Sequence, residues 1–245
     1  MKKTKNPFHM PVAQGNPAYI EPPHRFVNRE YFIITYETNP ILLQKIVPKG
    51  LKILAPVVKY EFIKMPDSSG FGSFVESGQV IPVTYNGKKG TFIHAMFLND
   101  QPAITGGREI WGFPKKLGHP SLEIDGDTLL GTLDYGKVRV ATGTMGYKFY
   151  PENTEIIQKF LGEPNFVIKT IPAPGGTAEI CQLVRYSMTD ITLHWAYSGP
   201  AALDLHPHAL APVAALPVKK VLSALHFMAD LTLPYGEVVI DYLKK

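Results

Sequence analysis

The chain has 245 residues, of which 45% are hydrophobic and 11% aromatic, and its formal net charge is +4. This apolar content is sufficient for one large domain or two small ones. The charge is modest and forms no long basic run beyond the N-terminal tip, which argues against a nucleic-acid partner. No signal peptide or membrane-spanning segment is expected, so no membrane partner is predicted. The single Cys181 allows no internal disulfide, which favours a cytoplasmic location.

The first part of the chain is rich in proline and is expected to form an extended arm over residues 1–23. Strand patterns follow almost to the end, because β-branched and aromatic residues recur in short runs. The predicted strands are Tyr31–Tyr36, Val57–Met65, Phe74–Tyr85, Thr91–Leu98, Thr128–Leu133, Val138–Met145, Phe166–Ile171, Ile180–Tyr197, Leu222–Leu233 and Glu237–Tyr242.

Turn signals favour antiparallel pairing of these strands. Asn86-Gly87 predicts a tight hairpin, and Asp125-Gly126-Asp127 predicts a second tight turn. Helical signals are short and few: Ile41–Val47 after Asn39-Pro40, Asn153–Phe160 before a glycine, and one or two turns at Pro217–Leu222. The pattern predicts a mainly β fold (β-rich α+β), an antiparallel sheet closed as a barrel or packed as a sandwich, in one unbroken domain over residues 1–245.

The most informative motif is a pair of adjacent lysines, Lys115 and Lys116, in the apolar and aromatic segment Trp111–Gly118. Pro114 disfavours helix, so the pair is expected in an extended segment whose successive side chains point to opposite faces. One lysine can therefore face inward. An ordinary lysine has a pKa near 10.4, and a useful amine nucleophile at neutral pH requires a shift of roughly four units.

Two causes compete for that shift in pKa. Two ammonium groups that diverge to roughly 12 Å repel by only about 1.4 kcal/mol at an effective dielectric constant near 20. Burial against apolar walls can shift a lysine pKa by about three to five units. Desolvation is therefore predicted to dominate, with Lys116 a minor contributor, although most adjacent lysine pairs are solvated surface residues.

Three further ionisable residues lie within strand patterns: Arg29, Glu61 and Glu76. Each, taken singly, is more often a solvated residue than a site residue. Glu76 shares its strand face with Phe74 and Val80, which favours an inward position. A buried carboxylate requires a partner, and Arg29 is a candidate for a bidentate pair with it.

Several familiar chemistries find no support in the sequence. There is no nucleotide-binding glycine loop, no Gly-x-Ser-x-Gly elbow and no His-Glu-x-x-His motif. His206-Pro207-His208 offers two imidazoles but no third ligand at a suggestive spacing, so no metal is expected.

Taken together, four segments resemble acetoacetate decarboxylases: Asn28–Phe32, Glu76–Gln79, Pro114–Gly118 and Gly131–Lys148. The resemblance extends from about residue 17 to residue 244. It implies a cone-like closed β-barrel, a homo-oligomer that can be as large as a dodecamer, a small 3-oxo acid substrate, and no cofactor or metal. This family is itself a general example of an activated lysine, whose lowered pKa is attributed to desolvation or to a neighbouring cation.

By this resemblance Lys115 is the Schiff-base lysine and Lys116 its neighbour, with Arg29, Glu61 and Glu76 in the same pocket. The implied reaction converts acetoacetate to acetone and carbon dioxide through an iminium on Lys115. Expected apolar walls of the pocket are Phe26, Met96, Phe97 and Phe113, although each fits an ordinary core position equally well. Phe113 departs from the tyrosine common in the family, so no phenol is expected to act there.

Two alternatives remain open at this point. The same scaffold could perform Schiff-base aldol or dehydration chemistry on larger oxo-acids, although the intact Arg29, Glu61 and Glu76 argue against it. A noncatalytic barrel that binds small apolar ligands is the alternative from another class.

Overall fold

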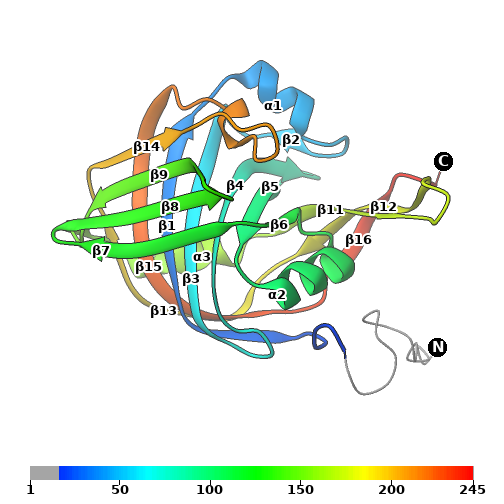
Figure 1. The fold of residues 1–245 in the computed structure, drawn as a ribbon, viewed down its shortest axis with the longest axis horizontal. Coiled ribbons are helices and arrows are strands. Elements are labelled where there is room, and N and C mark those ends of the chain that lie inside the picture. The colour runs from blue at the N-terminus through cyan, green and yellow to red at the C-terminus, as the bar shows by residue number, and fades with distance from the viewer. Residues whose placement is uncertain (1–16, 245) are drawn as a thin grey trace.

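The computed structural model describes residues 17–244, which form a mainly β structure of two packed sheets with a few short helices (Figure 1). Residues 1–16 of the expected N-terminal arm lie outside the described residues. In the remaining part of that segment, Tyr19 is buried against Gly106 and its hydroxyl donates to Glu109 Oε2 at 2.5 Å.

The larger sheet has the strand order β10-β13-β15-β1-β3-β4-β5-β11-β12-β16, with β2 beside β4 and β6 beside β5. Its pairs are antiparallel except β5 with β6 and β5 with β11. Its strands are β1 His24–Glu37, β2 Lys52–Ile53, β3 Val57–Ser68, β4 Gly72–Tyr85, β5 Lys88–Leu98, β6 Lys115–Leu117, β10 Tyr150–Pro151, β11 Asn165–Pro172, β12 Ala178–Tyr186, β13 Thr189–Ser198, β15 Lys220–Leu233 and β16 Glu237–Asp241.

The smaller sheet has the order β14-β9-β8-β7 and lies across the larger one (Figure 1). Its strands are β7 His119–Asp125, β8 Thr128–Tyr135, β9 Val138–Gly146 and β14 Ala201–Leu205. Within the described residues neither sheet is closed on itself, because the outermost strands do not pair with each other: β10 and β16 in the larger sheet, β14 and β7 in the smaller. The prediction of a mainly β fold is confirmed, and the closed barrel is not confirmed.

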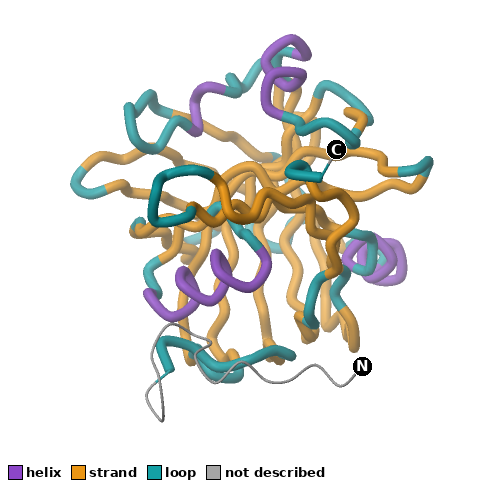
Figure 2. Tube along the Cα trace, turned by 90° about the vertical axis from the view of Figure 1, so that its right-hand side faces the viewer, coloured by secondary structure: helices purple, strands orange, loops and turns teal. Residues whose placement is uncertain are grey.

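The helices lie at the periphery of the sheets (Figure 2). They are α1 Pro40–Ile46, α2 Gln101–Gly106 with the π-helical turn η1 Gly107–Trp111, α3 Thr154–Leu161 and the 3-10 turn η2 Val213–Ala215. Asn39 caps α1, as the sequence signal predicts, and Asn153, expected as the first residue of its helix, caps α3; each accepts a hydrogen bond from a first-turn backbone N–H. No helix of residues 17–244 is long and apolar enough to cross a membrane.

The two faces of the larger sheet bury two separate cores because strand side chains alternate. On β1, Phe32, Ile34 and Tyr36 face the core shared with the smaller sheet. Tyr31 and Ile33 face a second core, which α2, η1 and α3 cover. The second core carries the candidate site.

The turn predictions are confirmed. Asn86 and Gly87 adopt φ of 48° and 78° between β4 and β5, and Gly126 adopts φ of 59° between β7 and β8. Two helix and strand predictions are wrong. Pro217–Leu222 is not helical, since β15 begins at Lys220, and the expected strand Ile180–Tyr197 is broken into β12 and β13. Strands β7 and β14 and helix α2 were not expected from the sequence.

Candidate active site

Strand β6 carries the lysine pair and places the two side chains on opposite faces of the sheet. Lys115 is in register with Met96 of β5, and Lys116 with Phe97. The Lys115 row continues across the sheet through Gly78 of β4 to Glu61 of β3. Gly78 has no side chain, and a Cβ at this position would lie 2.2 Å from the Ala95 carbonyl oxygen, so β5 approaches β4 closely in this row.

The Lys115 side chain is enclosed, with 10% of its surface exposed. Its Nζ lies 3.4 Å from Glu76 Oε2 and 5.1 Å from the centre of the Phe113 ring. Desolvation by burial lowers the pKa of Lys115, while the Glu76 carboxylate opposes this change and the Arg29 cation adds to it. The arrangement favours an amine that loses its proton more readily than a surface lysine.

Lys116 lies on the other face, where its Nζ donates to the Leu210 carbonyl and stands 5.1 Å from the centre of the Tyr135 ring. It is not among the groups that shift the pKa of Lys115. The divergence expected from the extended chain is therefore confirmed.

Two glutamates from adjacent strands approach the same space. Glu76 is almost fully buried on β4, on the face that alternation with Phe74 and Val80 predicts. Burial raises the pKa of Glu61 to about 7, although Lys59 and Arg29 act in the opposite direction. Glu61 can therefore hold or release a proton near neutral pH.

Arg29 is positioned by a bulge in β1, where Asn28 adopts φ of 53°. Its guanidinium carbon lies 5.0 Å from the centre of the Phe26 ring and 4.8 Å from that of Tyr31. The expected bidentate pair with Glu76 is wrong: among the described residues Glu76 forms its ion pair with Lys115, and Arg29 Nε is buried without a hydrogen-bond partner.

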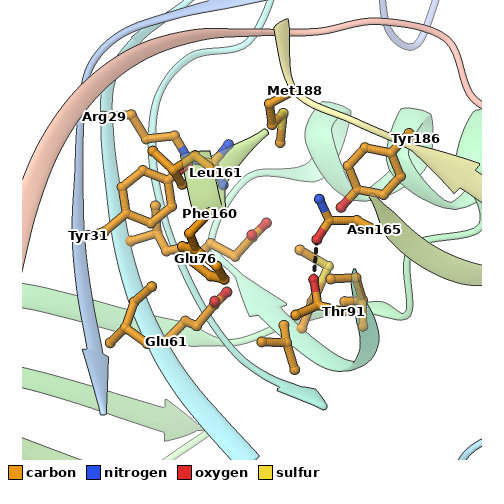
Figure 3. A pocket seen from close by; sticks show the side chains of 15 residues that line it. Arg29, Tyr31, Glu61, Glu76, Thr91, Phe160, Leu161, Asn165, Tyr186 and Met188 are labelled. Carbon is orange, nitrogen blue, oxygen red and sulfur yellow. Dashed lines mark hydrogen bonds between the residues drawn. The ribbon is translucent and has the colours of Figure 1, made fainter. Parts of the chain in front are cut away.

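A small cavity of about 70 Å³ lies between the larger sheet, at strands β1, β3, β4 and β5, and the end of helix α3 (Figure 3). Glu61, Glu76 and Arg29 line it; Lys115 does not, but its Nζ lies 3.4 Å from the Glu76 carboxylate that does. The other lining residues are Tyr31, Ile33, Ile63, Val80, Thr91, Ile93, Met96, Phe160, Leu161, Asn165, Tyr186 and Met188.

Of the four expected apolar walls, one lines the cavity and two others contact site residues. Met96 lines the cavity, Phe113 flanks the amine, and Phe26 packs on Arg29. Phe97 does not belong to this site. It lies in the other core with its ring 6.0 Å from that of Tyr135, because adjacent residues of a strand face opposite sides.

Sequence reasoning missed two phenols and the cover of the cavity. Tyr31 and Tyr186 line the cavity, and burial raises the pKa of both, so they stay neutral hydrogen-bond donors. Tyr186 packs edge-on against Phe113 at 5.1 Å. Residues two apart on a strand face the same side of the sheet, so the position of Arg29 could have indicated that Tyr31 also faces the site. Nothing in the sequence indicates that Leu161 of α3 covers the sheet here.

The donor set does not suggest a metal. No group of three or more His, Cys, Asp or Glu side chains suitable for a metal ion occurs within residues 17–244.

The acetoacetate decarboxylase family model matches residues 9–243 of the chain. The chain is 60% identical over 236 residues to the acetoacetate decarboxylase of Acidiphilium cryptum, covering 96% of each protein. It is 57% identical over 238 residues to that of Chromobacterium violaceum, covering 97% of this chain and 96% of the other. A crystal structure of acetoacetate decarboxylase from Legionella pneumophila superposes with a TM-score of 0.94 at 52% identity, covering 97% and 95% of the two chains. The chain therefore belongs to the acetoacetate decarboxylase family.

Proposed function

We propose that this protein is an acetoacetate decarboxylase, a carboxy-lyase that releases carbon dioxide from acetoacetate through a Schiff base on Lys115. The observation that carries the proposal is the enclosed Lys115 amine, flanked by Phe113 and paired with Glu76 at a small cavity. The high identity to proteins of that name over nearly the whole chain supports the substrate.

The reaction begins when the neutral Lys115 amine adds to the oxo carbon of acetoacetate. Loss of water from this adduct gives a protonated imine. The bond between the α-carbon and the carboxylate then breaks, its electron pair forms the enamine and neutralises the imine nitrogen, and carbon dioxide leaves. Protonation of the enamine at carbon and hydrolysis release acetone and restore the amine.

The glutamates and the arginine have complementary roles in this proposal. Glu61, with a pKa raised to about 7 by burial, supplies and recovers the proton that the enamine carbon takes. Arg29 has a buried Nε without a partner in the described residues and attracts the substrate carboxylate. Glu76 repels that carboxylate and so disfavours the bound anion relative to neutral carbon dioxide.

Borohydride reduction in the presence of acetoacetate tests the proposal, because it converts the imine to a stable secondary amine. Peptide mass mapping should find the added isopropyl group on Lys115. The Lys116→Ala protein is the matched control and should be labelled at Lys115 equally. Absence of added mass on Lys115 in both proteins would overturn the Schiff-base assignment.

Release of carbon dioxide separates this proposal from the nearest alternative. An aldolase or dehydratase of the same scaffold, acting on larger oxo-acids, would form an imine but would not decarboxylate acetoacetate. Stoichiometric formation of acetone and carbon dioxide is the expected result. Trapping without gas release would favour the alternative.

We also infer a closed cone-like barrel, a homo-oligomer and a cytoplasmic location. The smaller sheet supports a barrel, because β7 lies against β3, β4 and β5 while β14 lies against β1 and β15.

Exposed apolar side chains near the C-terminus, at Tyr235, Val238 and Leu243, support burial between subunits of a homo-oligomer, up to a dodecamer. Sedimentation velocity tests the oligomer. The lone Cys181 fits a reducing compartment.

A further inference from the structure

The cavity beside Lys115 is covered by the last turn of α3, which the reaction described above does not use. Leu161, the last residue of that helix, is buried and lines the cavity. Its neighbour Phe160 is held in place by Lys59 of β3, whose Nζ lies 3.6 Å from the centre of the Phe160 ring. This contact fixes the helix end above the strand row that contains Lys59.

That row is apolar where it meets the cavity. Lys59 is in register with Val80 of β4, which is in register with Ile93 of β5, and both apolar side chains line the cavity. The row of Lys115, Gly78 and Glu61 lies next to it. The cavity thus has a polar part lined by Arg29, Glu61 and Glu76, and an apolar part to which Val80, Ile93 and Leu161 contribute.

A 3-oxo acid has matching ends. Its carboxylate suits the side that contains Arg29, and the alkyl group on its oxo carbon suits the apolar side. We propose that Leu161 limits the length of this alkyl group and so confines the enzyme to short 3-oxo acids. This proposal rests on the proposed decarboxylation.

The limit follows from the size of the cavity. At about 70 Å³ it has little spare volume for a longer substrate. Val80, Ile93 and Leu161 are all buried, and buried side chains of a packed core relax only partly. A longer alkyl group would therefore collide with the Leu161 side chain.

The experiment compares kcat/KM for acetoacetate, 3-oxopentanoate and 3-oxohexanoate by carbon dioxide release. Leu161→Ala removes three carbon atoms and should raise the ratio of kcat/KM for 3-oxohexanoate over acetoacetate by about tenfold or more, the scale of methylene discrimination in an apolar pocket. Because both substrates meet the same active sites, this ratio does not depend on the fraction of folded protein.

Ile157→Ala is the matched control. Ile157 lies one turn earlier on the same buried side of α3 but does not line the cavity, so its truncation should leave the ratio within about twofold of the unaltered protein. Leu161→Val, which removes one carbon atom, is the second variant in case the alanine protein does not fold. It should raise the ratio for 3-oxopentanoate.

Two results from the variants would overturn the proposal: an unchanged ratio in both Leu161 variants, or an equal rise in Ile157→Ala. Failure of the proposed function would be recognised separately, because the unaltered protein would then release no carbon dioxide from acetoacetate. An unaltered protein that decarboxylates acetoacetate and 3-oxohexanoate equally well would refute the length limit alone.

Discussion

Replacing Lys116 with alanine should alter the acidity of the Lys115 amine only slightly. The two side chains leave β6 on opposite faces, and Lys116 Nζ is bound to the Leu210 carbonyl. At a separation of roughly 12 Å and an effective dielectric constant near 20, the repulsion between the ammonium groups is about 1.4 kcal/mol. Its loss favours the charged amine, so the titration midpoint should move to higher pH by about 1 pH unit at most.

Glu76 provides the comparison, because its charge has the opposite sign and lies much closer. At 3.4 Å from Lys115 Nζ its attraction is about 5 kcal/mol at the same effective dielectric constant. Glu76→Gln should therefore move the midpoint to lower pH, and by more than Lys116→Ala moves it upward. The two substitutions therefore shift the Lys115 midpoint in opposite directions and by different amounts, which distinguishes the effect of Glu76 from that of Lys116.

The pH dependence of Lys115 acetylation by acetic anhydride measures this midpoint without reference to turnover. Peptide mass spectrometry follows the extent of modification at Lys115 in the unaltered protein and in both variants. A midpoint that rises by three or more pH units in Lys116→Ala would refute the reasoning. Repulsion from the adjacent Lys116 cation, and not burial, would then be the main cause of the lowered pKa of the Lys115 amine.

Three further substitutions and one control variant test the site. Lys115→Ala should abolish acetone formation while urea unfolding stays cooperative; residual turnover would exclude Lys115 as the nucleophile. The stability of Glu61→Gln relative to the unaltered protein should rise between about pH 4.5 and about pH 7 and stay level above that range. A carboxyl with a raised pKa stabilises the fold fully below its ordinary value of 4.5 and loses this contribution as pH rises through about 7. A pH-independent difference in urea midpoint would contradict that pKa. Gly107→Ala would place a methyl 2.7 Å from Lys115 Cδ and 3.2 Å from Nζ, so the amine must move and kcat/KM for acetoacetate should fall about a hundredfold. Gly106→Ala, whose methyl would meet Tyr19 instead, should leave Lys115 acetylation unchanged.

The strands could be predicted from the sequence where their side chains alternate and their turns have a defined chemistry. Asn86-Gly87 is the clearest case, because both residues adopt the positive φ that a two-residue hairpin requires. Helix α2 and η1 could not be predicted in this way. The segment Gln101–Trp111 includes two adjacent glycines and no regular apolar spacing, and it is held by contacts that lie far away in the chain, including Tyr19.

The chemistry of the site could be predicted better than its shape. Lysine, arginine and two glutamates stand out against apolar strands, and the structure brings Lys115, Glu76, Glu61 and Arg29 together. The partner of Glu76 was misassigned because sequence gives no distance between strands. Glu76 is diagonal to Lys115 across β5, and only the register reveals this contact.

Departures from regular alternation determine which apolar residues form the walls. Met96 and Phe97 are adjacent, so strict alternation excludes one of them from the site, but it does not say which. A bulge at His94 in β5 changes the parity, so that Ile93 and Met96 both face the cavity and Phe97 faces the other core. A second bulge, at Val27-Asn28 in β1, similarly puts Phe26 beside Arg29. Two extra residues in two strands thus position the cavity, and neither departure is visible in the hydrophobic pattern.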